Sequence, residues 1–348
     1  MKVITCASYY GSGSSAITDL VSEYNTVKSL TDYEIRIIHE IDGISDLEYH
    51  LVECPNRHNS GHALKRFEKL AKFFAGSQLI PRYETFFNGK YWILTEDYIN
   101  SLLDFKFKGN RFADWYDRGT IFYYYQSILK KICRKLNISI NTMPYTYQYY
   151  SHPSESRFLE CTKKYTSKLL EAANTSGSDI IVVDQLLPSS NINRCLRYFN
   201  DDVFVVVVDR DPRDVFLTNK YVWKDAQVPI EPNSFCEWFI HTHNDSANEA
   251  WDDSRIKKIY FEDLIYKYSD TCKLIEGFLN LNPHMHVNKF KYLNPKRSVV
   301  NTRLWEKYND NDSIEIIETK LRRYLYDYSQ LTNNGVVEGE STEDNTVF

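Results

Sequence analysis

Apolar residues occur along the chain in two patterns: short continuous runs, and longer stretches with helical spacing. The clearest are the nearly continuous runs at residues 180–183 and 203–208, and residues 3–7 form a similar strand-like run that includes Thr5. Short runs of this kind are typical of parallel strands that are buried on both faces. Two further strands are predicted at residues 35–38 and 258–260.

Helical spacing fills the segments between these strands. Apolar residues recur at intervals of three and four in residues 16–21, 62–74, 192–198 and 264–278. Strands that alternate with helices predict an α/β fold, with a doubly wound parallel sheet flanked by helices. Sheets of this type bind their ligands at the carboxyl ends of the strands.

Residues 83–150 differ from this pattern because they are rich in aromatic side chains and are predicted to be helical at 121–136. We interpret the segment as a helical, aromatic-rich insertion that caps the sheet. Its rings either stack on sugar rings or form the half-buried faces of ordinary helices. One domain is predicted over residues 1–330. Residues 331–348, rich in Asn, Gly, Glu, Ser and Thr, are predicted to be disordered.

Composition narrows the classes of function. The formal net charge of -5 argues against a general nucleic-acid binder, so any anion site must be local. No apolar stretch approaches the ~20 residues of a membrane span. A strand-like run follows Met1 almost at once, so no signal peptide is expected. The seven scattered cysteines include no CxxC pair, which predicts free thiols in a reducing cytoplasm and no zinc site.

A glycine turn is predicted between the first strand and the first helix. Its backbone N–H groups, together with the helix N-terminus, could hold a phosphate-like anion, although a purely structural turn is an equal alternative. The GxxxxGK[ST] spacing of a Walker A loop is absent, which disfavours a P-loop nucleoside or sugar kinase acting with Mg²⁺ and ATP. The turn consists of Gly11, Ser12, Gly13, Ser14 and Ser15.

A second group of polar residues follows the buried run at residues 203–208. Pro212 suits the first turn of a helix, which leaves Arg210 at the carboxyl end of the strand and Thr218 on the second turn of the helix. An arginine fork and a hydroxyl in these places can grip a phosphate from two sides. A solvated face of Arg–Asp ion pairs is the alternative. The position directly after a buried strand favours the ligand site.

The segment from Arg210 to Thr218 resembles the RxP(R/K)Dxxx(S/T) motif of sulfotransferases that use 3′-phosphoadenosine-5′-phosphosulfate (PAPS). Three other segments resemble parts of that family in the same order: the N-terminal strand, turn and helix; residues 259–264, similar to its (R/K)YEDL segment; and residues 297–305, similar to its C-terminal donor-closing segment. The resemblance covers residues 1–25 and 178–306 and leaves out the middle of the chain.

The resemblance implies a P-loop-like nucleotide-binding architecture and a role for each matching residue. Arg210 and Thr218 would bind the 3′-phosphate of PAPS, the glycine turn would bind the 5′-phosphosulfate, and Arg297 with Ser298 would close on the 3′ end. It also implies transfer of a sulfuryl group to an acceptor hydroxyl without a metal. The aromatic insertion favours a carbohydrate acceptor; a small phenol, a lipid-linked sugar and a protein tyrosine stay open.

One departure from the family concerns a positive charge. The family's first loop carries a Lys or Arg that neutralises the bridging oxygen of the donor, and Gly11 stands at that position here. Arg57, Lys65 and Arg66 are the predicted replacements, because the leaving group's charge needs compensation. Without a replacement, the chain would be a slow sulfotransferase, or an inactive scaffold that binds PAPS or glycans.

A second departure concerns the general base. Asp184 follows the strand at residues 180–183, where many family members have a histidine. A carboxylate can accept the proton of the acceptor hydroxyl if burial raises its pKa, so Asp184 is the candidate base. A turn or helix-capping aspartate is the alternative. His58 and His62 are rival bases, or else solvated loop histidines.

Overall fold

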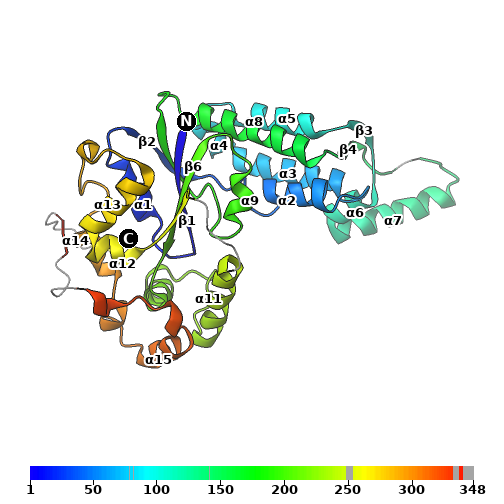
Figure 1. Cartoon of the computed structure of the whole chain (residues 1–348). Helices are drawn as coiled ribbons and strands as arrows, with labels where there is room; N and C mark the ends of the chain where they lie inside the picture. Colours follow the sequence, from blue (N-terminus) through cyan, green and yellow to red (C-terminus); the bar gives the residue numbers. More distant parts are fainter. Residues whose placement is uncertain (78, 81, 141, 248–253, 332–336, 340–348) are drawn as a thin grey trace. The chain divides into compact units, whose positions relative to one another are not determined.

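The computed structural model describes residues 1–77, 79–80, 82–140, 142–247, 254–331 and 337–339 (Figure 1). The chain divides into two compact units, which we call the first unit (residues 1–36 and 170–348) and the second unit (residues 37–169). Most of the tail predicted to be disordered, residues 331–348, lies outside the described residues. The prediction of one domain over residues 1–330 stays a prediction.

The first unit is built on a parallel sheet of five strands in the order β2-β5-β1-β6-β7. Each continuous apolar run of the sequence lies in one of its three central strands, because these strands are covered on both faces. Val3 of β1, for example, pairs with Ile181 of β5 and with Val203 of β6. The strands are β1 (Lys2–Ser8), β2 (Val27–Glu34), β5 (Ile180–Asp184), β6 (Asp202–Asp209) and β7 (Ile256–Tyr260).

One strand prediction was wrong. The second strand is β2, at Val27–Glu34, and residues 35–38 lie outside the sheet. Strand β2 is at the sheet edge, and more than half of its side chains are exposed or half-buried. An edge strand of this kind needs no apolar run. Ile37 and Ile38 are buried as part of a turn in the second unit, which explains their apolar character.

Helices cover the sheet of the first unit. Helices α1, α12 and α13 pack on one face and form a core with Ile4, Val182 and Val206, whereas α9 lies on the other side (Figure 1). The predicted α/β fold with a parallel sheet flanked by helices is therefore confirmed. The helices are α1 (Ser15–Ser22), α9 (Ile192–Leu196), α10 (Pro212–Leu217), α11 (Pro232–Ala247), α12 (Phe261–Tyr266), α13 (Tyr268–Leu279), α14 (Pro295–Ser298) and α15 (Asn311–Lys320).

Short helical turns complete the first unit. A π-helical turn, Thr218–Trp223, continues α10, and 3₁₀ turns follow at Pro283–Met285, Val299–Asn301, Leu304–Glu306, Arg322–Tyr324 and Tyr328–Gln330. The single helix predicted over residues 264–278 is instead the pair α12 and α13, because Lys267 between them leaves the helical conformation at φ -128° and ψ 38°.

The second unit is mainly helical. Its core contains the parallel, stacked rings of Tyr98 on α5 and Tyr165 on α8, with centroids 4.5 Å apart, and Phe67 of α3 meets Tyr98 edge-on. The elements are α2 (Ile44–Glu48) with a π-helical turn at Tyr49–Glu53, α3 (Ser60–Ala75), α4 (Tyr83–Phe86), α5 (Tyr91–Leu102), α6 (Phe112–Asp117), α7 (Gly119–Lys135), α8 (Glu155–Ala173), and the antiparallel strands β3 (Phe105–Gly109) and β4 (Thr146–Tyr150).

The second unit spans more of the chain than the predicted insertion at residues 83–150, because α2, α3 and most of α8 belong to the unit as well. The helices predicted at 62–74 and 121–136 correspond to α3 and α7. Part of the aromatic content serves the core: Tyr83, Tyr91 and Tyr98 are each at most 3% exposed. No helix in the described ranges is long and apolar enough to cross a membrane.

Candidate functional site

The glycine turn has a backbone that requires glycine. Gly11 and Gly13 have φ angles of +74° and +78°, in the left-handed region that L side chains rarely adopt. A Cβ on Gly13 would also lie 2.7 Å from the ring of Phe261. Ser12 N–H donates to the Tyr9 carbonyl at 3.2 Å and closes the turn. The turn is thus fixed by its two glycines and by its close approach to α12.

Donor groups gather where this turn enters α1. The first N–H groups of a helix have no carbonyl partner within the helix, and the helix dipole places partial positive charge there. In α1 the N–H groups of Ala16 and Ile17 donate to the carbonyls of Gly13 and Ser14 at 3.1 and 3.0 Å, so an anion would bind the N–H groups that precede them. Ser12 is 2% exposed, and its hydroxyl has no hydrogen-bond partner in the described part of the chain. A buried polar group without a partner is costly unless a ligand or water satisfies it. This end of α1 therefore has the features of an anion site.

Arg210 and Thr218 lie together, as the predicted two-sided grip requires. Arg210 follows β6 and is fully buried. Its Nη2 donates to Thr218 Oγ1 at 3.1 Å and to the Asn301 carbonyl at 2.5 Å, and its Nη1 donates to the Gly11 carbonyl at 2.9 Å. Pro212 begins α10, as expected. Arg210 thus joins the glycine turn, α10 and the C-terminal segment at the carboxyl edge of the sheet.

The acids of these motifs have structural partners. Asp214 is fully buried and accepts the N–H groups of Arg303 at 3.1 Å and Leu304 at 2.7 Å. Burial raises its pKa to about 7, although the charge of Arg210 opposes the shift. Glu262 accepts the N–H of Asp211 at 2.9 Å, and burial raises the pKa of this carboxyl as well. These carboxyls hold the segments that surround Arg210.

The second arginine of the motif, Arg213, is paired with carboxylates and does not line the cavity described below. Its guanidinium forms ion pairs with Asp211 at 2.8 Å and Glu318 at 2.7 Å, and it lies over the ring of Trp305 at 3.7 Å. These contacts anchor α15 and the segment at residue 305 to α10. We therefore assign Arg213 a structural role.

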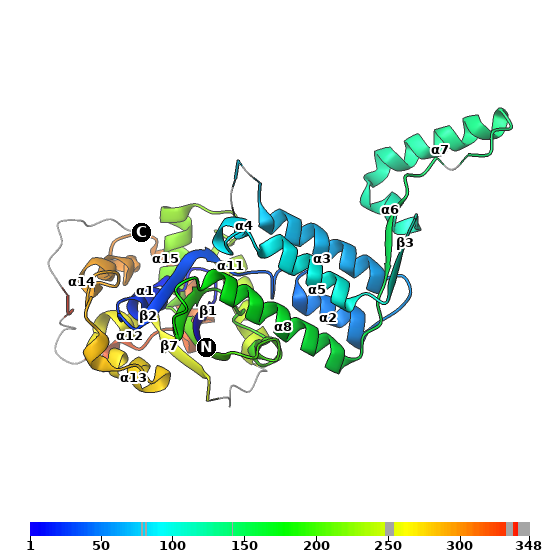
Figure 2. The ribbon, with the colours of Figure 1, turned by 90° about the horizontal axis from the view of Figure 1, so that it is seen from above.

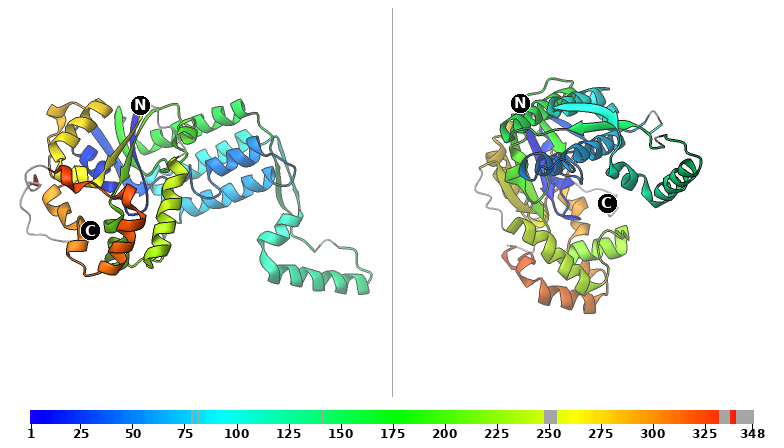
Figure 3. Two further views of the ribbon diagram at one scale, coloured as in Figure 1. Left: turned by 60° about the horizontal axis from the view of Figure 1, so that its bottom comes forward. Right: turned by 90° about the vertical axis from the view of Figure 1, so that its right-hand side faces the viewer.

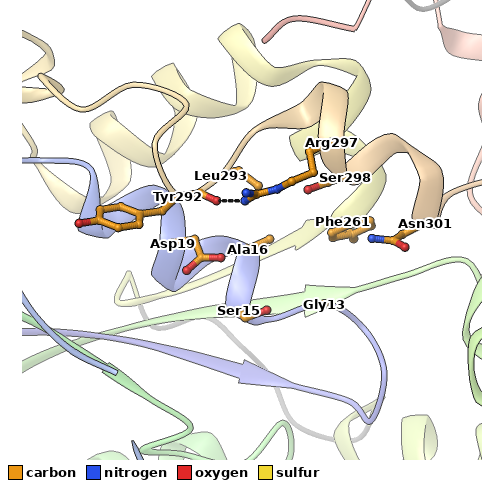
Figure 4. Close-up of a pocket in the computed structure, with 10 residues that line it drawn as sticks. All are labelled: Gly13, Ser15, Ala16, Asp19, Phe261, Tyr292, Leu293, Arg297, Ser298 and Asn301. Atoms are coloured by element: carbon orange, nitrogen blue, oxygen red, sulfur yellow. Dashed lines mark hydrogen bonds between the residues drawn. The ribbon is translucent and has the colours of Figure 1, made fainter. Parts of the chain in front are cut away.

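A cavity of about 250 Å³ opens beside the start of α1 (Figure 4). It unites three segments that the sequence had marked separately: the glycine turn, the start of α12 and the C-terminal segment. Arg297 Nη2 donates to the Tyr292 carbonyl at 2.6 Å on the cavity wall. The lining residues are Gly13, Ser15, Ala16, Asp19, Phe261, Tyr292, Leu293, Arg297, Ser298 and Asn301.

The predicted site residues have unequal access to this cavity. Gly13, Ser15, Arg297 and Ser298 line it, whereas Arg210 and Thr218 do not. Asn301 lines the cavity and covers the guanidinium of Arg210 with its carbonyl. An anion can contact Arg210 from this side only if the segment at Asn301 moves.

Asp19 is a cavity residue that sequence reasoning missed. It lies one turn beyond Ser15 on α1, so both side chains occupy the same helix face. Burial raises the pKa of Asp19 to about 6; Arg297 opposes the shift, and Glu23 and Asp184 add to it. The spacing of four residues from Ser15 could have placed Asp19 in the cavity. It was overlooked because a carboxylate is not expected in a site that binds an anion.

Asp184 stands at the end of β5, as predicted. Its Oδ1 accepts a hydrogen bond from the Cys6 thiol at 2.9 Å. Burial raises the pKa of the Asp184 carboxyl, while the hydrogen bonds from Cys6 and from the Gln185 backbone act in the opposite direction. A raised pKa is what a general base needs. The role of Asp184 as that base stays a prediction.

Gln185, the next residue, makes the contact with the glycine turn. It adopts a left-handed conformation at φ 51°, which turns its side chain so that Nε2 donates to Ser8 Oγ at 2.8 Å and to Ser14 Oγ at 3.1 Å. A backbone strained in this way often marks a functional position. Gln185 therefore positions the turn from the neighbouring strand.

The other predicted candidates lie in the second unit. Arg57, His58, His62 and Arg66 line a second cavity there, of about 640 Å³. Lys65 does not line it and donates to Asp114 at 2.8 Å. The roles proposed for these residues, as rival bases or as the missing cation, stay predictions.

No family model matches the chain, and no curated protein does. Solved structures resemble it weakly. The sulfotransferase domain of the Synechococcus PCC 7002 olefin synthase is 11% identical, with a TM-score of 0.40 and coverage of 92% of this chain and 94% of that one. Sulfotransferase STF9 from Mycobacterium avium is 13% identical, with a TM-score of 0.38 and coverage of 93% and 76%.

A retinol dehydratase solved with retinol and PAP is 15% identical, with a TM-score of 0.35 and coverage of 94% of this chain and 81% of that one. At these identities and TM-scores the likeness carries no argument about function. The case for a function rests on the residues of this chain.

Proposed function

We propose that the chain is a sulfotransferase that moves a sulfuryl group from PAPS to an acceptor hydroxyl, with a carbohydrate as the acceptor class and the cytoplasm as its location. One observation carries the proposal. Arg210 bonds both the Gly11 carbonyl and the Thr218 hydroxyl, so the two segments that resemble donor-binding motifs meet at the carboxyl ends of the adjacent strands β1 and β6. The seven cysteines form no disulfide within the described part of the chain, which favours a reducing compartment.

In this proposal each segment binds one end of the donor. The N–H groups that precede Ala16, where the glycine turn enters α1, and the Ser12 hydroxyl would bind the 5′-phosphosulfate. Arg210 and Thr218 would bind the 3′-phosphate after the segment at Asn301 moves away from the Arg210 guanidinium. Arg297 and Ser298 would then close over the 3′-phosphate. ATP has no 3′-phosphate, so contacts from both Arg210 and Thr218 to this group would select PAPS over ATP.

Asp184 would accept the proton of the acceptor hydroxyl. The acceptor oxygen then forms a bond to sulfur while the bond from sulfur to the 5′-phosphate oxygen breaks, which leaves a sulfate ester and 3′,5′-ADP. The protein contributes alignment and charge stabilisation, as in phosphoryl transfer.

A donor-binding protein without transferase activity is the second candidate. It is favoured by Gly11, which supplies no cation to the leaving group. It is also favoured by Lys258 in the middle of β7, because the ammonium of this lysine is paired at 2.8 Å with Asp209 at the end of β6. Turnover separates this candidate from the enzyme.

Calorimetry with 3′,5′-ADP, 5′-AMP and Mg²⁺-ATP tests the assignment. We expect 3′,5′-ADP to bind most tightly, because only this nucleotide carries the group that Arg210 and Thr218 would contact. Equal binding of ATP would contradict the proposal. Tight 3′,5′-ADP binding without sulfation of a mixed glycan pool supplied with PAPS would contradict the carbohydrate acceptor and favour the donor-binding protein.

The pKa of Asp19 predicts how nucleotide binding depends on pH. Above about pH 6 its carboxylate is charged in the cavity, and below that pH it is neutral. Loss of this negative charge beside an anion should strengthen 3′,5′-ADP binding by about threefold to tenfold as pH falls from 8 to 5.

The nucleotide phosphates also titrate in this range, with a pKa near ~6. The measurement is therefore the ratio of wild-type to Asp19→Asn affinity at each pH, which cancels the ligand's own titration. We expect the variant to bind more tightly than wild type at pH 8 and equally at pH 5. A ratio that does not change with pH would show that Asp19 does not face the nucleotide.

A further inference from the structure

The cavity of about 640 Å³ in the second unit has an unusual charge composition. Arginine is the only constitutively charged residue type in its lining, and two histidines accompany the three arginines. Cavities with such walls favour anions. The lining residues are Arg57, His58, His62, Arg66, Arg111, Phe112, Ala113, Tyr116 and Tyr150.

Arg111 carries an unsatisfied donor in this wall. Its Nη1 donates to the Arg57 carbonyl at 3.2 Å, and its guanidinium lies over the ring of Tyr150 at 4.2 Å. Its Nη2 is buried and has no hydrogen-bond partner within the described ranges. A buried donor of a charged group without an acceptor is costly. An anionic ligand would supply the acceptor.

The backbone holds Arg111 in this position. Gly61 lies at the start of α3, where a Cβ would overlap the Tyr149 carbonyl oxygen and lie 3.4 Å from Arg111 Nη1. The absence of a side chain at Gly61 therefore lets β4 and Arg111 approach the helix. A guanidinium fixed in this way loses little freedom when it binds a carboxylate or sulfate.

The other cationic groups add to the positive field. Arg57 Nε donates to His58 Nε2 at 3.0 Å, which leaves its terminal nitrogens for a ligand. Arg66 forms an ion pair with Asp42 at 2.6 Å, and His62 lies 3.4 Å from Asp117. Burial lowers the pKa of His62, and Arg66 and Lys65 lower it further against the effect of Asp117. Arg57 and Arg111 form no ion pair with any residue that the structure describes, so theirs are the unopposed charges.

We propose that this cavity binds an acidic carbohydrate. Arg111 and Arg57 bind its carboxylate or sulfate group as bidentate forks. The exposed rings of Phe112 and Tyr116, 81% and 77% accessible, provide flat apolar faces for the sugar ring. That this saccharide is also the acceptor of the transfer rests on the proposed function; its binding does not.

Calorimetry with a uronic-acid tetrasaccharide and its carboxyl-reduced, neutral counterpart tests the proposal on the full chain. We expect binding of the acidic form only, weakened by salt, and a loss of about tenfold or more in Arg57→Ala and in Arg111→Gln. Lys72→Ala is the matched control: it removes an exposed cation on α3 that is paired with Glu68 and lies outside the cavity, and it should change nothing.

Equal affinity for the neutral tetrasaccharide, or an equal loss in the control, would overturn the proposal. Circular dichroism of each variant establishes that it is folded. Titration of the same samples with 3′,5′-ADP separates the two proposals, because Arg111→Gln, which lies outside the predicted donor site, should keep wild-type nucleotide affinity. Saccharide binding without nucleotide binding would contradict the donor assignment alone, and the reverse would contradict the cavity alone.

A different observation, the surface of α7, carries a second inference. Figures 2 and 3 show this helix extending beyond α6 and β3 of the second unit. One of its faces packs through Gln126, which is buried and donates to the Thr142 carbonyl at 3.1 Å. The opposite face is an exposed apolar stripe at helical spacing: Ile121, Tyr125, Ile128 and Ile132, which are 87%, 55%, 58% and 47% accessible.

The charges of this segment are all positive. Residues 118–140 contain five cations and no acid: Arg118, Lys130, Lys131, Arg134 and Lys135. At 100° per residue, Lys131 and Lys135 fall beside the apolar stripe. A basic amphipathic helix with large apolar side chains is typical of helices that lie in the interface of a bilayer.

We propose that α7 docks on an anionic lipid surface, with its apolar stripe below the headgroups and its lysines on the lipid phosphates. The uniform positive charge complements anionic lipid. Sedimentation of the full chain with vesicles of phosphatidylcholine alone, and of equal parts phosphatidylcholine and phosphatidylglycerol, tests this. We expect binding to the second kind only, reduced by salt.

Ile128→Asp, and the double variant Lys131→Glu with Lys135→Glu, should each lower binding about tenfold or more. The matched control is Lys164→Glu with Lys168→Glu, which reverses two exposed charges at the same spacing on α8 and should bind normally. Equal binding to neutral vesicles, or an equal loss in the control, would contradict the proposal. A dimer in solution that Ile128→Asp dissociates would show instead that a second copy covers the stripe.

Discussion

Replacing Arg210 with alanine is expected to weaken 3′,5′-ADP binding by about thirty-fold to several thousand-fold. Removal of one partner of a desolvated, hydrogen-bonded charge pair costs roughly 2–5 kcal/mol, which gives this range. Binding of 5′-AMP, which lacks the 3′-phosphate, should change little. Calorimetry with both nucleotides measures the difference. An equal loss for both, or none for either, would mean that Arg210 does not bind the 3′-phosphate.

Arg210 also has structural contacts, which a control must separate from binding. It donates to the carbonyls of Gly11 and Asn301, so Arg210→Ala leaves buried acceptors and lowers stability. Thr218→Val is the milder probe, since it removes one hydroxyl and keeps the shape of the side chain. It should cost about 1.5–3 kcal/mol of 3′,5′-ADP binding, as for a hydrogen bond to a charged group. If Thr218→Val loses affinity for 3′,5′-ADP and not for 5′-AMP, the proposed 3′-phosphate site is supported even if Arg210→Ala fails to fold.

Replacing Asp184 with asparagine is expected to lower sulfuryl transfer by about 10²–10⁴ and to leave 3′,5′-ADP affinity nearly unchanged. The carboxylate would accept the acceptor proton, and asparagine cannot. In the wild type, transfer should rise with pH through the raised pKa of Asp184, because only the ionised form is a base. Single-turnover assays across pH measure both effects.

The first control for Asp184→Asn is a variant at another carboxyl. Asp19→Asn removes a carboxyl with a raised pKa in the same unit and should keep most of the transfer rate.

The second control is the stability of the Asp184→Asn variant itself. The native state binds the Asp184 proton more tightly than the unfolded state does, so ionisation of this carboxyl lowers the stability of the wild type as pH rises. Asp184→Asn should therefore not destabilise the fold at neutral pH. A variant that keeps more than about a tenth of wild-type turnover would favour His58 or His62 as the base.

The sequence by itself determined the centre of the sheet and the local geometry of the site. Residues 3–7, 180–183 and 203–208 predicted β1, β5 and β6, because strands buried on both faces are apolar at nearly every position. Gly13 marked the turn because its left-handed backbone favours glycine. Pro212 marked the start of α10 because its ring fixes φ near the helical value and its missing N–H is not needed there. Each of these features depends on residues that are neighbours in the sequence, so the sequence pattern is enough to predict it.

Only the tertiary structure decided what touches these elements. The Asn301 carbonyl that covers Arg210 lies 91 residues away, and the partners of Asp214 lie 89 and 90 residues away. Arg111 meets the Arg57 carbonyl across 54 residues. Strand β2 was missed because an edge strand has no apolar run, and Asp19 because its raised pKa arises from burial and from neighbours that folding brings near. Contacts between segments far apart in the chain leave no periodicity in either one, so no spacing of residues could have predicted them.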